Sequence, residues 1–246
     1  MCKTIKEFLN RLDIKEIRKH DMGKLMAEDF FRDPCRHITI NDDLFLAPAD
    51  GVVLYAHPEV KPDQDLEIKG KNFTLKDMLA YPEYAENSLV VGIFMTSLDV
   101  HINRIPFSAY FIDRFETNFI YTHNISMILV ENELLFEFGY DKKSLGYLTS
   151  NEKKVSVFYA PTIKSRYYIV QVGDKDIDVV LNWGHGRHLH QGIRFGAIRY
   201  GSQVDLVIPL KKGNKYEVLV KPLDHVEAGI DPIVRVVSHD KSRMES

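Results

Sequence analysis

Beyond Pro34 the chain consists largely of short apolar segments separated by turn residues, and this pattern limits the folds open to it. Apolar and polar residues alternate in most of these segments, which is typical of β-strands with one buried face. Turn sequences such as Lys-Lys-Gly-Asn at 211–214 separate consecutive segments. The segments that we predict to be strands are Leu89 to Met95, Val155 to Tyr159, Ile177 to Leu181, Val204 to Ile208 and Tyr216 to Val220.

The first 30 residues follow a helical pattern instead. Thr4 and Glu7 have the spacing of a capping box, and apolar residues then recur at helical intervals. These apolar residues are Ile5, Phe8, Leu9 and Leu12, followed by a second amphipathic set of Met22, Leu25, Met26 and Phe30. The segment can be interpreted as a helical hairpin packed on its own core or as a helix on a membrane surface, although its balanced charges weaken the second interpretation.

The two patterns together predict an α+β fold, with a mostly antiparallel β body and an N-terminal helical segment. We expect residues 1–30 to form that segment and residues 31–246 to form one domain. Within the domain, a short helix is predicted from Thr74 towards Ala80.

Composition excludes several classes of protein. A hydrophobic fraction of 45% and a net charge of -3 suit a soluble globular chain that does not bind nucleic acid through broad charge attraction. The two cysteines, Cys2 and Cys35, form neither a disulfide framework nor a metal motif, so a reducing, cytoplasmic location is expected. The longest apolar run, Ser88 to Ile112, is interrupted by charged residues and cannot span a bilayer.

Four stretches carry polar residues where a strand pattern predicts apolar ones. They are residues 30–34 (Phe-Phe-Arg-Asp-Pro), 47–51 (Ala-Pro-Ala-Asp-Gly), 94–106 and 192–205. Each has a simple explanation alone: Asp50 begins a turn pair, Asp99 and His101 can form a buried pair on one strand face, and Gly201 with Ser202 can form a turn. In combination, an Asp, a His and a Ser preceded by Gly are the parts of an activated nucleophile.

Together and in this order, the stretches resemble the phosphatidylserine decarboxylase family, in particular its shorter bacterial and archaeal branch. The likeness runs from Phe30 to Pro209 and is most specific in Leu-Asp-Val-His at 98–101 and in Arg-Tyr-Gly-Ser at 199–202. The resemblance implies a precursor that cuts itself between Gly201 and Ser202. The products would be a β chain of residues 1–201 and an α chain of residues 202–246, with Ser202 converted into a pyruvoyl group.

The resemblance also implies roles for individual residues. The Ser202 hydroxyl would attack the Gly201 carbonyl, and His101 is the candidate base that takes its proton and later acts as general acid. Asp50 is the candidate orienting carboxylate for that histidine, and Asp99 is a second candidate. On a regular strand the side chains of Asp99 and His101 would lie about 6–7 Å apart, so a direct contact would need a bend.

The chain departs from the family in three places. Arg104 occupies the position at which longer bacterial members carry a second histidine, so His101 serves both steps or one of His185, His188 and His190 substitutes. Asn-Glu-Leu at 132–134 replaces the usual Asn-Glu-Arg. The arginine pair expected after Gln171 is missing, which indicates either altered phospholipid handling or drift in a structural strand.

The expected function is therefore decarboxylation of a serine-headed phospholipid to phosphatidylethanolamine with release of CO2, at a membrane surface and without a metal. We also expect association of the β and α chains and a homo-oligomer. One alternative is a pyruvoyl-dependent decarboxylase of a soluble amino acid. Another is a homologue that no longer cleaves itself and binds lipid or a partner.

Overall fold

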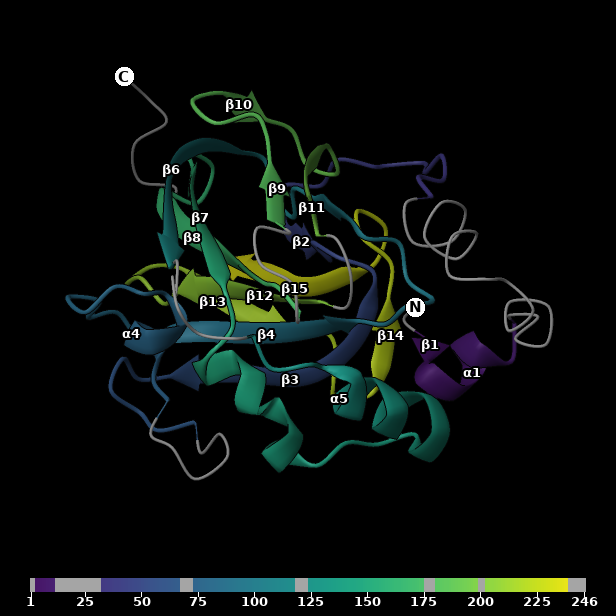
Figure 1. The fold of residues 1–246 in the computed structure, drawn as a ribbon. Helices are drawn as coiled ribbons and strands as arrows, with labels where there is room; N and C mark the ends of the chain where they lie inside the picture. Colours follow the sequence, from purple (N-terminus) through teal and green to yellow (C-terminus); the bar gives the residue numbers. More distant parts are fainter. Residues whose placement is uncertain are drawn as a thin grey trace, which may run out of the picture.

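A nine-stranded sheet forms the centre of the computed structural model, which describes residues 3–11, 32–66, 73–117, 124–174, 180–198 and 202–238 (Figure 1). All of its neighbouring strands pair antiparallel. In spatial order they are β1 (Lys3–Thr4), β14 (Asp224–Val226), β3 (Gly51–Val60), β4 (Ser88–Met95), β12 (Ser202–Pro209), β8 (Ser165–Val172), β7 (Lys153–Ala160), β6 (Ala109–Thr117) and β10 (His188–Leu189).

Two three-stranded sheets complete the β body. One contains β5 (Ile102–Arg104), β11 (Arg194–Ile198) and β9 (Val180–Asn182) in the order β5-β11-β9. The other contains β13 (Lys215–Val218), β15 (Pro232–Ser238) and β2 (Leu44–Leu46) in the order β13-β15-β2. Their pairings are also antiparallel, so the predicted mostly antiparallel β body is confirmed.

Helices within the described ranges are few and short. They are α1 (Ile5–Leu9), α4 (Leu75–Met78), α5 (Ile128–Asn132), a π-helical turn at Glu133–Glu137 and a 3-10 helix at Lys142–Thr149. The capping box predicted at Thr4 and Glu7 starts α1. The helix predicted from Thr74 towards Ala80 is present as α4, and Thr74 and Asp77 form a capping box at its start. No helix in these ranges combines the length and apolar character needed to span a bilayer.

The predicted N-terminal helical segment is therefore confirmed only at α1. Residues 12–31, which hold the second amphipathic set, lie outside the described residues. The predicted strand from Ile177 to Leu181 is described only from Val180 onward, as β9.

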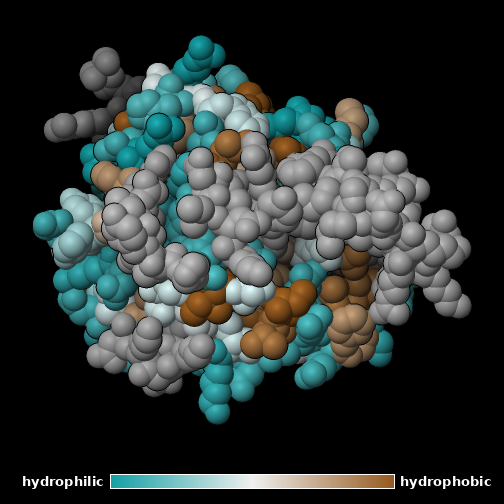
Figure 2. Space-filling view, viewed as in Figure 1, coloured by the Kyte–Doolittle hydropathy of each residue, from teal (hydrophilic) through white to brown (hydrophobic). Residues whose placement is uncertain are grey.

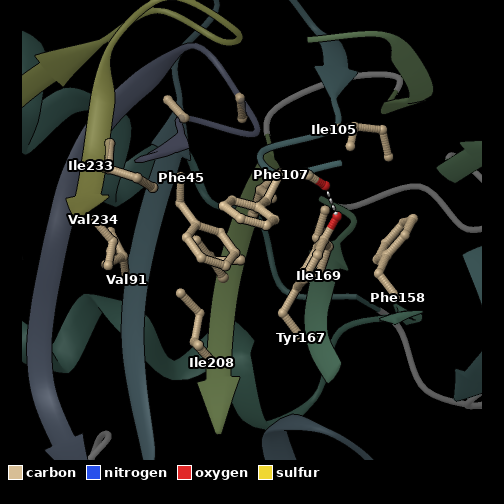
Figure 3. Close-up of a cluster of buried hydrophobic side chains, with 14 of the residues drawn as sticks. Phe45, Val91, Ile105, Phe107, Phe158, Tyr167, Ile169, Ile208, Ile233 and Val234 are labelled. Atoms are coloured by element: carbon tan, nitrogen blue, oxygen red, sulfur yellow. Dashed lines mark hydrogen bonds between the residues drawn. The ribbon is translucent and has the colours of Figure 1, made fainter. Parts of the chain in front are cut away.

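Apolar side chains fill both faces of the central sheet. On β12 the alternation predicted from the sequence places Val204, Leu206 and Ile208 in one core cluster and Val207 in the other. Figure 3 shows the first cluster, where the Tyr167 hydroxyl donates a hydrogen bond to the Phe107 carbonyl at 2.7 Å. Because β12 is buried along its whole length between β4 and β8, its first residue starts inside the protein.

Candidate active site

Hydrogen bonds join all four polar stretches around the ends of β4, β5 and β12. The Ile198 amide donates to the His101 carbonyl at 3.2 Å, and the Arg104 amide donates to the Pro48 carbonyl at 2.8 Å. The Arg104 guanidinium also contacts the Asp33 carboxylate at 3.1 Å. Asp33 therefore connects the stretch at 30–34 to the other three stretches. Residues that are far apart in sequence therefore form one polar region at the edge of an apolar core.

Asp99 organises the turn that follows β4. Its Oδ2 accepts hydrogen bonds from the amide and the hydroxyl of Thr96, at 2.8 and 2.7 Å. Its Oδ1 lies 2.7 Å from Nε2 of His225, and both side chains are 1% exposed. Burial alone raises the pKa of Asp99, but the interactions with His225 and Thr96 outweigh it and leave that pKa below its ordinary value. Asp99 is therefore a buried carboxylate whose charge is stabilised by these neighbours.

His225 is a member of this site that the sequence did not single out. It lies on β14, where Lys3 of β1 is its partner, and its ring stacks on Phe8 of α1 with centroids 3.6 Å apart. Its sequence context, Asp-His-Val in a short strand, carries no motif that distinguishes it from a structural histidine. Only the three-dimensional contact with Asp99 indicates its role.

His101 is held through the main chain. Its side chain is completely buried, and Nδ1 lies 2.9 Å from the carbonyl oxygen of Asp99. A carbonyl can only accept, so Nδ1 carries the proton and Nε2 is left as the basic nitrogen. Burial, reinforced by the charge of Arg32 and opposed by Asp99, lowers the pKa of His101 to about 4, so the ring is neutral at pH 7. A neutral ring with a basic Nε2 is the form that a general base requires.

Asp50 is ion-paired with Arg36. The two guanidinium nitrogens reach the two carboxylate oxygens at 2.6 and 2.7 Å, and the Ala228 amide donates to the same carboxylate at 2.7 Å. Burial nevertheless raises the pKa of Asp50 above its ordinary value. The following residue, Gly51, has φ +151°, and a Cβ there would lie 2.1 Å from the Phe94 carbonyl oxygen, so glycine is required at this position.

Ser202 is the first residue of β12, is completely buried and pairs with Met95 at the end of β4. Gly201, on the other side of the predicted cleavage bond, lies outside the described residues. The next side chain, Gln203, is fixed on the opposite face of the sheet by the Tyr55 hydroxyl and by Asp205, both at 2.6 Å. These bonds hold the start of β12 in one register.

The structure thus gathers Asp50, Asp99, His101 and Ser202 at one end of the central sheet, but it gives the two carboxylates partners other than the one predicted. The Asp99 carboxylate bonds His225 while its carbonyl bonds His101, and Asp50 bonds Arg36.

The alternative histidines lie elsewhere. His185 packs against Phe111 of β6, while His188 pairs with Tyr110 of β6 and packs against His190. In the sheet, β7 and β8 separate β6 from β12.

Two further features bear on ligands. Among the described residues there is no cluster of His, Cys, Asp or Glu side chains arranged for a metal ion. A cavity of about 390 Å³ lies beside β3 and the 3-10 helix, with Tyr55, Leu66, Tyr140 and Leu145 in its wall, and none of the predicted site residues lines it. This cavity is therefore separate from the buried polar region.

Comparison with known proteins identifies the family. The phosphatidylserine decarboxylase model matches residues 25–233. A putative archaetidylserine decarboxylase proenzyme of Methanothermobacter thermautotrophicus is 31% identical over 88% of this chain and 86% of its own length. A phosphatidylserine decarboxylase proenzyme of Chlorobium limicola is 31% identical over 84% of this chain and 77% of its own. No solved structure is a significant match. The resemblance noted in the sequence is thereby confirmed, and the chain belongs to the phosphatidylserine decarboxylase family.

Proposed function

We propose that this chain is a self-processing, pyruvoyl-dependent decarboxylase that converts a serine-headed phospholipid to phosphatidylethanolamine, or its archaeal-type equivalent, with release of CO2. The observation that supports this most directly is the buried, neutral His101 with a basic Nε2, which follows the end of β4 where Met95 pairs with Ser202. The family match extends over both regions.

Self-cleavage requires a base for the Ser202 hydroxyl, and His101 is proposed for that role. Attack on the Gly201 carbonyl moves the acyl group from nitrogen to the hydroxyl oxygen. Loss of the Ser202 α-proton then releases the residue 201 carboxylate, and hydrolysis of the resulting enamine exchanges ammonia for water. Asp50 and Asp99 are proposed as supporting residues that hold Arg36 and the 96–101 turn in place.

The residues around Ser202 fit a pyruvoyl group. The position is dry, because Ser202, Met95 and His101 are all fully buried, and the backbone is fixed by pairing with β4. When formed, this group supplies an electron sink for the departing carboxyl group. The chain's own contribution is to exclude water, to hold the substrate, and to carry a proton. His101 would accept this proton at its basic Nε2 from the substrate ammonium group and return it to the α-carbon after CO2 departs.

The two products, residues 1–201 and 202–246, are expected to stay together as one domain. Strands from the second product pair with strands of the first: β12 with β4 and β8, β14 with β1 and β3, and β15 with β2. These pairings support stable association of the two chains, and we propose that the assembled unit forms a homo-oligomer.

Peripheral contact with a membrane is supported by exposed apolar side chains on α5 and the turn that follows. Ile128 and Leu129 are 51% and 63% exposed, and Phe136 is 59% exposed. Apolar surface gathers in the lower part of Figure 2, over the region of α5. Such side chains suit insertion into a lipid headgroup layer at the cytoplasmic face. The alternative of a soluble amino-acid substrate predicts turnover without any lipid binding.

The test is the intact mass of the purified protein under denaturing conditions. We expect two chains whose masses sum to that of the precursor after exchange of ammonia for water. Ser202→Ala should remain one uncut, inactive chain. A wild-type chain that stays uncut after incubation with lipid would refute the enzymatic proposal and favour a binding role. For the cleaved protein, phosphatidylserine and free serine assayed side by side separate the lipid substrate from the soluble one.

A further inference from the structure

A group of arginines surrounds the buried site, and two of them share one carboxylate. Arg194 Nε lies 2.5 Å from Asp33 Oδ2, and Arg104 Nη2 lies 3.1 Å from Asp33 Oδ1. Arg104 on β5 and Arg194 on β11 are direct partners in the register of their sheet. Asp33 therefore holds two guanidinium groups side by side at the same end of two paired strands.

Three arginines lie close together in this region. Arg104 and Arg194 share the Asp33 carboxylate, Arg36 is paired with Asp50, and Asp99 is occupied by His225. Burial, together with the charges of Arg36 and Arg194, lowers the pKa of Arg104, which shows that these cations lie close to one another. Arg104 is 3% exposed, yet its Nε has no hydrogen-bond partner among the described residues. A buried guanidinium N–H of this kind lacks a hydrogen-bond acceptor, which an anionic oxygen would supply well.

The group extends from the catalytic histidine out to solvent. Arg104 follows His101 by three positions, which an extended chain spans in about 10 Å or less. The Arg104 side chain is 4% exposed, whereas that of Arg194 is 46% exposed. Arg194 is thus the member that an incoming ligand meets, and Arg104 lies behind it.

We propose that Arg194, with Arg104 behind it and Asp33 between them, forms the subsite that binds the phosphate of the substrate headgroup. This inference rests on the proposed function and specifies where the phosphate is bound. In a serine-headed phospholipid only the β-carbon and the ester oxygen separate the phosphate from the reacting α-carbon. The phosphate can therefore lie at the arginines while the α-carbon lies at His101. The subsite also supplies the arginines that the sequence lacks after Gln171.

The phosphate, rather than the substrate carboxylate, is the anion that these arginines suit. A cation paired with the carboxylate stabilises the ground state and loses its partner as CO2 departs, which raises the barrier to decarboxylation. The phosphate keeps its charge throughout the reaction. An arginine fork on phosphate therefore contributes equally to binding of the substrate and of the transition state, and it fixes the headgroup without slowing the chemical step.

The test uses Arg194→Gln and Arg194→Lys in the full chain, with Arg235→Gln as the matched control. Arg235 is also a half-exposed arginine paired with one carboxylate, that of Glu217, but it lies on β15 in a different sheet. Dioctanoyl phosphatidylserine, kept below its critical micelle concentration, is the substrate, so that vesicle binding does not enter KM. Dioctanoyl phosphatidylethanolamine, which has the phosphate but lacks the carboxylate, is the competitive inhibitor.

Three results are expected for Arg194→Gln. Self-cleavage, which involves no substrate, should proceed at the wild-type rate. KM should rise by about 10- to 100-fold, the effect of one lost charge-assisted contact, while kcat changes little. The inhibition constant of dioctanoyl phosphatidylethanolamine should rise by the same factor. Arg194→Lys should be intermediate and Arg235→Gln unchanged.

The proposal is overturned by an unchanged KM, or by a raised KM with an unchanged inhibition constant, because the second result would place the carboxylate at Arg194. It is also overturned if both Arg194 variants stay uncut while the wild-type chain is cleaved, since the arginine would then serve the precursor. Failure of the proposed function itself is distinguishable, because the wild-type chain would then show neither cleavage nor turnover.

Discussion

Replacing His225 tests how the site is held together. His225→Leu removes the donor to Asp99 Oδ1, which now lies 2.7 Å from Nε2, and leaves a carboxylate that is 1% exposed with donors on its other oxygen only. Removing one partner of a buried charged pair costs about 3–5 kcal/mol. The loss of the stack on Phe8 adds to this cost, so we expect a destabilisation of at least about 3 kcal/mol. His225→Gln keeps an amide donor that can reach Asp99 and should lose less than half as much.

The assay is urea unfolding in a Ser202→Ala background, where every molecule is one uncut chain. Because the folded-state pKa of Asp99 is lowered, its stabilisation is present at neutral pH. This stabilisation is lost as the pH falls below the pKa of Asp99 in the unfolded chain, about 4, and then through its lower pKa in the folded protein. The difference between His225→Leu and its parent should therefore be largest near pH 7 and shrink towards pH 3. His185→Leu, at an exposed histidine, serves as the control. A loss for His225→Leu no larger than that of the control would refute the reasoning.

Three further predictions concern neighbouring residues. Self-cleavage after a pH jump should have a constant rate above pH 5 and slow as the pH approaches about 4, where His101 becomes protonated; a rate that instead falls between pH 7 and pH 6 would contradict a base with this pKa. Gly51→Ala should destabilise the uncut precursor by more than about 2 kcal/mol in urea, because its Cβ would meet the Phe94 carbonyl; unchanged unfolding would show that β3 can move aside. Arg36→Leu leaves the Asp50 carboxylate buried without its ion pair and should cost about 3–5 kcal/mol in the same measurement, whereas Arg36→Leu combined with Asp50→Leu should recover part of that loss.

Local features of the fold could be predicted from the sequence because their causes are local. Alternation along Val204 to Ile208 and Val155 to Tyr159 reflects which face each residue presents to the core, and both segments are strands. The capping box at Thr4 involves residues only three positions apart. The order of strands in the sheet, in which β14 lies beside β3, depends on contacts that no local pattern records.

Only those residues of the site that lie in a recognisable motif could be predicted from the sequence. The stretches holding Asp50, Asp99, His101 and Ser202 were recognised together and do gather at one end of the sheet. Their hydrogen-bond partners were not predicted, because His225 lies 126 positions from Asp99 and no spacing rule connects the two. The structure also shows that the main-chain carbonyl of Asp99 accepts the hydrogen bond from His101. Such a bond could not be predicted, because every residue type has a main-chain carbonyl.

The position of Ser202 at the start of an interior strand affects the order of events during synthesis. Its strand pairs with β4 along its whole length and with β8 from Gln203 to Val207, and these two strands come from separate parts of the chain. The hydroxyl and the base that we assign to it can meet only after those parts have assembled. A precursor that cleaves as proposed would then become active only once folded, and the cut ends would provide a permanent record in each molecule that folding had been completed.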